Sequence, residues 1–307
     1  MIAQLAAIIL TFPGEGMRLP PATNTYCIGA VPTNPVSALV VNGVTTDVYR
    51  TGAFLAMVPV TGGVNRIVAE WNGETFVRTF KVDLPPKATG RPAPPSKPRD
   101  PFADLNLPTN TVCKPPPFGK RPEEVSILVD PGHGGKDTGA LSPRGWFEKD
   151  VNLAQAIAVR DAFKKAGFRV ALTREDDSFP ALYDRPKRAI RDDVDLFISI
   201  HHNATHCSHN PRLSRHTTTY ASNEPGRALA AAIQKHIAGV MAPVKDCGAQ
   251  MKSLAVCRNP AIPSCLVEVD FINLPEGEEE SWDPGRQKKV AAAIVMGVLD
   301  WMTKPSK

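Results

Sequence analysis

The chain has 307 residues and a mass of 33.1 kDa, which is enough for about two domains, and its 42% hydrophobic and 22% charged residues exclude a fully disordered protein. Its formal charge of +5 comes from residues 84–122, which contain seven basic and two acidic residues, whereas residues 1–83 and 123–307 are each neutral. Neither neutral region has the basic character of a nucleic-acid-binding domain, so we expect no nucleic-acid partner.

Residues 1–23 contain an apolar run from Ile2 to Phe12. A transmembrane helix needs about 20 apolar residues, so we expect no transmembrane segment. The run has the length of the apolar part of a signal peptide, but no Lys or Arg precedes Arg18 and no clear cleavage site follows. We interpret this segment as either a degenerate signal or a strand.

The six cysteines leave the compartment of the protein open. None of them forms a C-x-x-C pair, which argues against a zinc knuckle or a thioredoxin-type motif. An even number permits disulfides in an oxidising compartment, but buried free cysteines are also common in chains of this length.

Residues 24–83 have the pattern of short strands joined by tight turns. Asn42-Gly43 and Asn72-Gly73 each lie between apolar or alternating runs, which is a strong hairpin signal. The segment is predicted to be a small β-sandwich, and the stretch with Gly63, Asn65, Ile67 and Ala69 resembles the immunoglobulin-like accessory modules of extracellular enzymes. Since it has no cluster of titratable residues, we expect a binding or spacing role.

Residues 84–122 are predicted to be a proline-rich basic linker, because they hold 12 of the 30 prolines. Such density prevents a packed ladder and favours an extended chain. A peptide-recognition ligand is the alternative to a spacer. We hypothesise that the seven basic residues bind anionic polymers, in a way that salt weakens.

Residues 123–307 alternate strands with helices, which predicts an α/β domain with a mainly parallel or mixed twisted sheet flanked by helices. The predicted strands are Val125–Asp130, Phe168–Thr173, Asp195–Ile200 and Ala261–Val269. The predicted helices are Val151–Ala166, with Asp150 as its N-cap, Gly226–Val240 and Pro284–Met302.

Four residues in this region suggest metal chemistry. His133 and His201 each follow a predicted strand, Glu268 lies within a late strand, and Glu148 precedes the first helix. Open α/β sheets place their sites at the carboxyl ends of strands, so these residues can converge. Two histidines and a carboxylate are a familiar ligand set for catalytic zinc, although no H-E-x-x-H motif is present.

Four motifs in the same region resemble those of the zinc-dependent N-acetylmuramoyl-L-alanine amidases. They are Val129-Asp130-Pro131-Gly132-His133-Gly134-Gly135-Lys136-Asp137-Thr138-Gly139-Ala140, Glu148-Lys149-Asp150-Val151-Asn152-Leu153, Phe197-Ile198-Ser199-Ile200-His201 with Asn203-Ala204, and Leu266-Val267-Glu268 with Phe271. They occur in the order of the family and span roughly residues 125–303.

The resemblance implies that His133, Glu148 and His201 bind Zn²⁺ and that Glu268 is the catalytic carboxylate. It implies hydrolysis of the amide between N-acetylmuramic acid and L-alanine, with peptidoglycan as the partner. We expect a monomer in the cell envelope, either periplasmic or secreted. The alternatives are another zinc hydrolase that cuts peptide bonds in the wall and a non-catalytic wall-binding protein.

The chain departs from the family after the third and fourth motifs. His202 replaces a residue that is usually small, and Asp270 replaces a frequent glycine. We expect Asp270 to be a solvated loop residue rather than a ligand of the stem peptide.

The segment Thr205–Thr218 lacks the usual glycines and contains His206, His209 and His216. We interpret it as a solvated insertion, with a second metal site that includes His202 and His206 as the alternative. Arg174 and Arg185 resemble arginines of the family and either fix loops around the substrate or form surface ion pairs. His236 is expected at the surface of the second helix.

Overall fold

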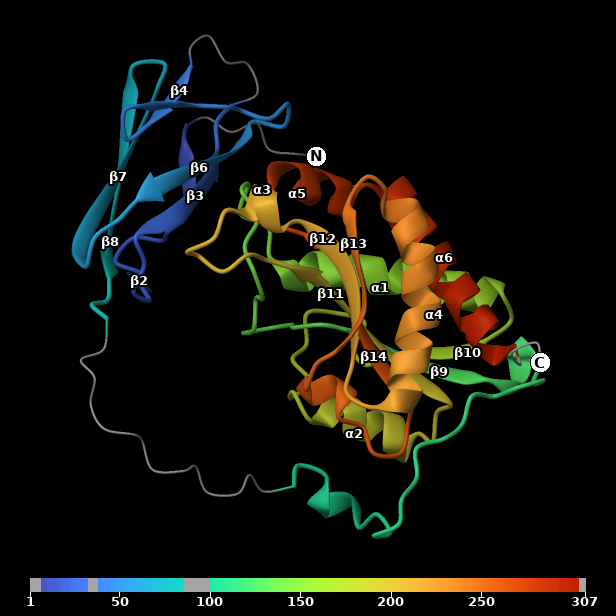
Figure 1. Cartoon of the computed structure of the whole chain (residues 1–307). Coiled ribbons are helices and arrows are strands. Elements are labelled where there is room, and N and C mark those ends of the chain that lie inside the picture. Colours follow the sequence, from blue (N-terminus) through green and yellow to red (C-terminus); the bar gives the residue numbers. More distant parts are fainter. Residues whose placement is uncertain (1–6, 33–37, 86–99, 304–307) are drawn as a thin grey trace.

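The computed structural model describes residues 7–32, 38–85 and 100–303. An N-terminal unit built from two β-sheets is followed by a larger α/β domain, and the two lie side by side (Figure 1). We call residues 7–32 and 38–85 the two-sheet unit, and residues 123–303 the α/β domain. Within the described residues, no helix is long and apolar enough to cross a membrane.

The two-sheet unit consists of a three-stranded and a five-stranded sheet. The first has the order β1-β3-β6 and the second the order β2-β8-β7-β4-β5. The strands are β1 (Ile9–Phe12), β2 (Arg18–Leu19), β3 (Asn24–Ala30), β4 (Leu39–Val41), β5 (Val44–Thr46), β6 (Ala53–Pro59), β7 (Gly63–Trp71) and β8 (Glu74–Val82).

A shared hydrophobic core lies between these two sheets. It includes Cys27 and Phe54 from the first sheet and Leu39, Ile67 and Phe80 from the second. Alternate residues of each strand point into this core, as the twofold period of a strand requires. Both predicted hairpin turns form, since β4 pairs with β5 and β7 pairs with β8 across the two Asn-Gly turns, whose residues all have positive φ.

The two-sheet unit begins before the predicted boundary at residue 24. β1 pairs with β3 and β2 pairs with β8, and Leu10 is buried. The described part of the apolar run is therefore a strand of this unit, which agrees with the second interpretation of that segment. Residues 1–6 lie outside the described residues.

The predicted linker contacts the α/β domain over residues 100–122, whereas residues 86–99 lie outside the described residues. The Lys114 backbone N–H donates to the Ala261 carbonyl, and the Lys114 ammonium lies 2.7 Å from the Asp193 carboxylate. Lys120 pairs with Asp195. This part of the predicted linker is therefore attached to the α/β domain, where Lys114 and Lys120 have acidic partners.

The α/β domain is built on a six-stranded sheet with the order β10-β9-β11-β14-β12-β13. All neighbouring strands are parallel except β12 and β14, so the predicted mixed sheet is confirmed. The strands are β9 (Ser126–Pro131), β10 (Arg169–Leu172), β11 (Leu196–Asn203), β12 (His216–Ala221), β13 (Lys245–Met251) and β14 (Ser264–Phe271).

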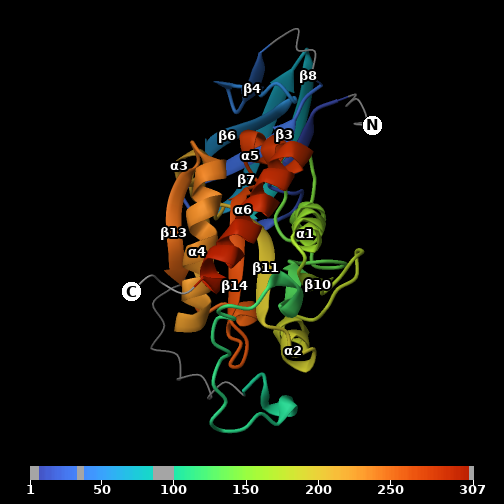
Figure 2. The ribbon, with the colours of Figure 1, turned by 90° about the vertical axis from the view of Figure 1, so that its right-hand side faces the viewer.

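Helices cover both faces of this sheet (Figures 1 and 2). The helices are α1 (Glu148–Lys165), α2 (Asp184–Arg191), α3 (Pro211–Ser214), α4 (Glu224–Met241), α5 (Pro275–Trp282) and α6 (Pro284–Met302), and the short 3-10 turns are η1 (Ala103–Leu105), η2 (Pro122–Glu124) and η3 (Ala255–Cys257). One face packs against α1, α4 and α6, and the other against α2 and η3.

Two details of the domain differ from the sequence prediction. α1 begins at Glu148 with Phe147 as its N-cap, so Asp150 is not the cap and lies inside the first turn. The expected insertion Thr205–Thr218 contains α3 and the start of β12, a central strand of the sheet. The threonines of β12 are buried but polar, and Thr219 donates to Gln234 on α4, so the strand lacks an apolar signal.

Candidate metal centre

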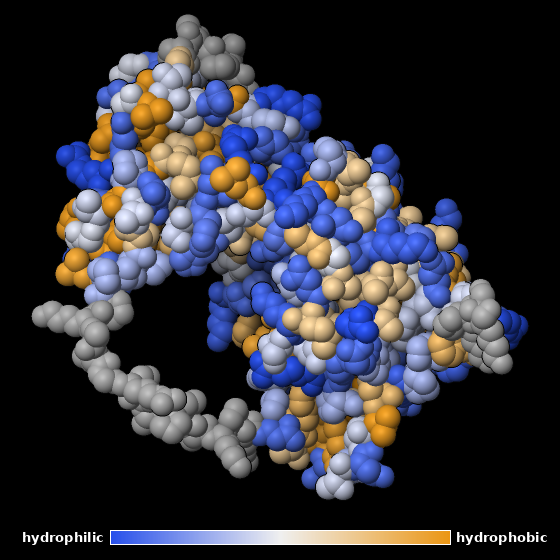
Figure 3. Space-filling view, viewed as in Figure 1, coloured by the Kyte–Doolittle hydropathy of each residue, from blue (hydrophilic) through white to orange (hydrophobic). Residues whose placement is uncertain are grey.

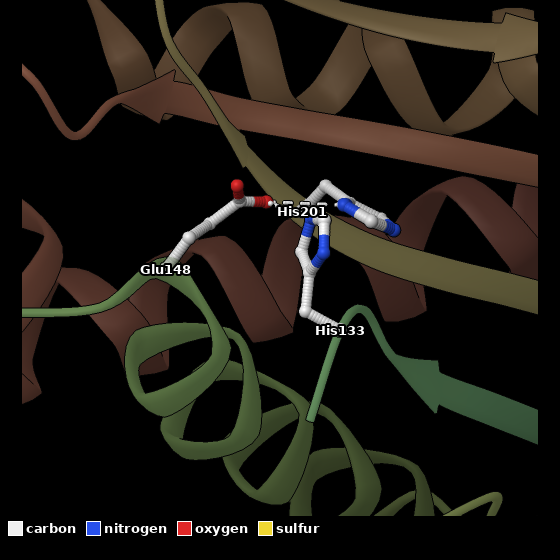
Figure 4. A group of neighbouring side chains, drawn as sticks. All are labelled: His133, Glu148 and His201. Carbon is white, nitrogen blue, oxygen red and sulfur yellow. Dashed lines mark hydrogen bonds and ion pairs between the residues drawn. The ribbon is translucent and has the colours of Figure 1, made fainter. Parts of the chain in front are cut away.

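His133, Glu148 and His201 come together at one end of the sheet (Figure 4). His133 lies in the turn after β9, Glu148 is the first residue of α1, and His201 lies in β11. One ligand atom from each lies within 4.8 Å of the others, and no other such group of three occurs in the described part of the chain. The three predicted ligands therefore form a possible metal-binding group.

The spacing of the ligand atoms suits a tetrahedral ion. His133 Nε2 and His201 Nδ1 each lie 3.1 Å from Glu148 Oε1. Ligand atoms at about 2.1 Å from one tetrahedral zinc ion are about 3.4 Å apart. Two imidazole nitrogens and one carboxylate oxygen are also the donor types of catalytic zinc sites, so the residues present fit this metal.

Glycines leave room for the three ligands. A Cβ atom at Gly132 would collide with the ring of His201, and one at Gly139 would lie 2.6 Å from Glu148 Oε2. His133 itself has a φ of 61°, a left-handed conformation that is unfavourable for a residue with a side chain. The glycines of the motif around His133 therefore allow the backbone to lie close to the side chains of His201 and Glu148.

Two buried arginines hold the turn that carries His133. Arg174 donates to the carbonyls of Pro131 and Gly132, and Arg185 donates to the carbonyls of Pro131 and His133. Both are only 3% exposed, so the alternative of surface ion pairs is wrong. Arg174 also donates to the carbonyls of Lys149 and Asp176, and Arg185 to that of Pro180, so the two arginines join this turn to α1 and to the loop after β10.

We expect Arg185→Met to destabilise the protein by about 3–5 kcal/mol, because it leaves a buried carboxylate without its cation. Arg185 Nη1 lies 2.8 Å from Asp130 Oδ1, and both side chains are nearly inaccessible. Urea unfolding measures the change. Arg227→Met is the control, since its pair with Glu224 is just as short but exposed, and its loss should cost less than about 1 kcal/mol.

The charges in the centre shift its pKa values in opposite directions. Burial alone raises the pKa of Glu148, but hydrogen bonds from His133 and His201 outweigh it and hold that pKa well below its usual value. Burial alone lowers the pKa of His133, but Glu148 and Asp137 raise it to about 9. The carboxylate of Glu148 is thus ionised at neutral pH, as a metal ligand must be.

Glu268 lies next to this group without being part of it. In the sheet, Glu268 of β14 is paired in register with His201 of β11 and shares its face. Its Oε2 atom is inaccessible and has no hydrogen-bond partner among the described residues. Burial raises its pKa to about 7, although His201 acts in the opposite direction. A carboxylate with a near-neutral pKa beside a candidate metal centre is suited to proton transfer.

A cleft of about 300 Å³ borders the centre, lined by His133 and His201 together with apolar side chains. Phe179, Leu182 and Val256 supply these apolar walls. These three residues could not be assigned to a site from the sequence, because their segments carry no motif. Phe179 and Leu182 are 39% and 54% exposed, so they are accessible to a substrate.

His202 and Asp270 are both buried, so the expectation that Asp270 is a solvated loop residue is wrong. His202 points to the opposite face from His201, toward α1, and burial lowers its pKa to about 4. Asp270 is 1% exposed and binds Arg215 through both carboxylate oxygens, at 2.6 and 2.9 Å. Arg215 was not identified from the sequence, because its partner lies 55 residues away.

The remaining histidines form no second metal group in the part of the chain that the structure describes. His206 is exposed, whereas His202 of β11 is buried against α1, so these two histidines do not form the alternative metal site. His216 is half-buried at the start of β12 and packs edge-on against Phe271. His236 is half-buried on α4, with its Nε2 atom 2.7 Å from Asp300.

The two-sheet unit packs on the loops that follow the site residues. Its side chains Tyr26, Ile28 and Leu55 form a buried cluster with Phe271 and Leu274, just after Glu268. Figure 3 shows that the two parts of the molecule are in contact.

Hydrogen bonds join the unit to the loops on either side of the other ligands. The Tyr26 hydroxyl donates to the carbonyl of Thr205, four residues after His201, and Thr11 donates to the carbonyl of Pro143, five residues before Glu148. The unit therefore supports three segments that carry site residues, and it does not serve only as a spacer.

We expect Leu55→Asp to separate the two-sheet unit from these loops, because it places a charge in their buried contact. Leu55 is 7% exposed. Val77→Asp, on the outward face of β8, is the control and should leave the contact intact, since Val77 is already 39% exposed. Limited proteolysis of the loops that follow β11 and β14 measures both variants. Equal cleavage in the two would show that the contact does not hold these loops.

The α/β domain is similar in sequence to known proteins. A sequence profile of the family described as N-acetylmuramoyl-L-alanine amidase matches residues 127–300. The uncharacterized protein YqiI of Bacillus subtilis is 34% identical over 176 residues, which cover 57% of this chain and 84% of the relative. The N-acetylmuramoyl-L-alanine amidase AmiA of Escherichia coli is 30% identical over 217 residues, which cover 57% and 75%.

Solved structures are similar over the same region. The catalytic domain of CwlV, an N-acetylmuramoyl-L-alanine amidase from Bacillus (Paenibacillus) polymyxa var. colistinus, aligns with a TM-score of 0.54 at 31% identity, over 58% of this chain and 98% of that one. An N-acetylmuramoyl-L-alanine amidase from Clostridium difficile 630 aligns with a TM-score of 0.55 at 29% identity, over 59% and 98%. The mixed α/β fold of the domain is thus that of these catalytic domains.

Proposed function

The chain belongs to the N-acetylmuramoyl-L-alanine amidase family, and on this basis we propose that it is a zinc-dependent peptidoglycan amidase that releases the stem peptide from N-acetylmuramic acid. The observation that carries the proposal is the His133, Glu148 and His201 group beside Glu268. Amide hydrolysis at neutral pH needs an activated water and a proton carrier. The group and its neighbouring carboxylate can provide both.

The side chains of His133, Glu148 and His201 would hold the zinc ion. Bound zinc would polarise the scissile carbonyl and lower the pKa of a water from 15.7 to about 7. Glu268 accepts the proton of the attacking water and later donates it to the leaving nitrogen of L-alanine. The apolar walls at Phe179 and Leu182 border the same cleft and are suited to apolar parts of the substrate.

Digestion of purified peptidoglycan sacculi tests this function. We expect soluble peptides with a free L-alanine amino group and glycan strands with free lactyl carboxyl groups, identified by mass. A chelator should stop their release, and added zinc should restore it. Cleavage within the stem peptide would instead support a zinc peptidase, and binding without cleavage would support a non-catalytic wall protein.

We propose further that the protein acts as a monomer in the cell envelope, periplasmic or secreted, where peptidoglycan is accessible. The two-sheet unit is proposed to be an immunoglobulin-like accessory domain, with the α/β domain beginning near residue 123. Light scattering of the purified chain tests the monomer, and fractionation of producing cells tests the location.

A further inference from the structure

His202 is a buried side chain that the proposed reaction does not use. It follows the ligand His201 in β11 but points to the other face of the sheet, where it is 1% exposed. Its Nδ1 atom lies 2.8 Å from Asn152 Oδ1, whereas its Nε2 atom is buried without a hydrogen-bond partner. An unpaired buried nitrogen costs free energy, so packing alone would favour an apolar side chain here.

Asn152 connects His202 to the candidate metal ligand Glu148. It is fully buried on α1, one turn after Glu148, and its Nδ2 atom lies 3.1 Å from Glu148 Oε1. An ionised carboxylate only accepts hydrogen bonds, so Asn152 must present its amino group to Glu148 and its carbonyl oxygen to His202. His202 must then carry its proton on Nδ1, because that atom has to donate.

We propose that His202 is a positioning residue that orients Glu148 through Asn152. The proposal rests on the metal centre proposed above. Without the Nδ1 donor, the buried Asn152 oxygen would have no partner, and the amide would be held less firmly in the orientation that donates to Glu148. Substitution of residues that orient metal ligands in this way typically weakens metal binding by about 10–100-fold.

Two substitutions separate orientation from packing. Asparagine at position 202 places an amino group where Nδ1 lies, whereas leucine fills the space but cannot donate a hydrogen bond. We expect His202→Leu to weaken zinc binding by about 10–100-fold and His202→Asn to bind zinc more tightly than the leucine variant. Competition with a chromophoric chelator measures the dissociation constant of each full-length protein for zinc.

A double-mutant cycle tests the connection through Asn152. In an Asn152→Ala background, His202→Leu should have no further effect on zinc affinity, because the link is already broken. His236→Leu, on α4, is the control and should bind zinc as the wild type does.

The outcomes separate this proposal from the proposed function. Zinc affinity in His202→Leu equal to that of the wild type, or higher than in His202→Asn, would overturn the role of His202 alone and leave the metal centre standing. A wild-type protein that binds no zinc would overturn both.

Discussion

The Glu268→Gln variant is expected to hydrolyse muropeptides about 10²–10⁴-fold more slowly than the wild type, since general acid–base catalysis contributes effects of this size. Glutamine keeps the shape of the side chain but cannot accept a proton. Glu268 is not one of the three ligand residues, so zinc affinity should stay unchanged. Steady-state rates and zinc content, measured on the same preparation, test both expectations.

The dependence of the rate on pH should change in the same variant. Burial raises the pKa of Glu268 to about 7 in the metal-free protein, and only the ionised form can accept a proton. The rate of the wild type should therefore rise with pH through this ionisation, and the limb should be missing in Glu268→Gln.

A control residue makes the Glu268 result specific. Glu224→Gln changes an exposed carboxylate at the start of α4 and should leave the rate unchanged. A Glu268→Gln variant that retained the wild-type rate would contradict the assignment of Glu268, whatever the metal content.

The His133→Ala variant is expected to lose bound zinc and to fall to the rate of the chelator-treated wild type. It leaves only Glu148 and His201, and three protein ligands are the usual minimum for a catalytic zinc site. The zinc content of the dialysed protein and the release of lactyl carboxyl groups measure the effect. In addition, the loss of the His133 side chain removes one of the hydrogen bonds that lower the pKa of Glu148.

His206→Ala is the matched control for this loss. His206 is exposed and belongs to no ligand group in the described residues, so its removal should change neither zinc content nor rate. Full activity in His133→Ala after dialysis against chelator would contradict a catalytic metal at this centre.

The convergence of the two histidines was predictable because each is marked by local sequence, whereas Glu148 was assigned as a ligand only through the resemblance of its motif. His133 lies between glycines after an apolar strand and His201 ends another apolar run, but an acid such as Glu148 before a helix is common without a metal. The carboxyl ends of parallel strands meet at one edge of a sheet, so these local signals determine which residues meet.

The polar strand β12 was not predictable from apolar periodicity. Thr217, Thr218 and Thr219 are buried through hydrogen bonds to partners distant in the chain, among them the carbonyls of Glu268 and Gly248. The pair of Arg215 and Asp270 was not predictable for the same reason. Its partners are distant in the chain, and each residue alone looks like a surface charge.

The sequence of β3 contains a partial signal that the two-sheet unit packs against another surface. Residues Thr25–Ala30 of β3 are buried on both faces of the strand, although the sheet packs on its partner sheet through one face only. A strand whose residues are apolar on both faces therefore indicates a second covering surface. Here that surface is formed by the loops after β11 and β14. The sequence does not identify which surface covers it.

The proposed reaction breaks the amide bond between the lactyl group and L-alanine. Cleavage of a defined muramoyl-L-alanyl peptide in water labelled with ¹⁸O tests it most directly, by mass analysis of both products. We expect one ¹⁸O atom in the lactyl carboxyl group, an unlabelled peptide with a free L-alanine amino group, and product formation about 10²–10⁴-fold slower in Glu268→Gln. Label in a carboxyl group of the peptide, with the lactyl amide intact, would contradict it.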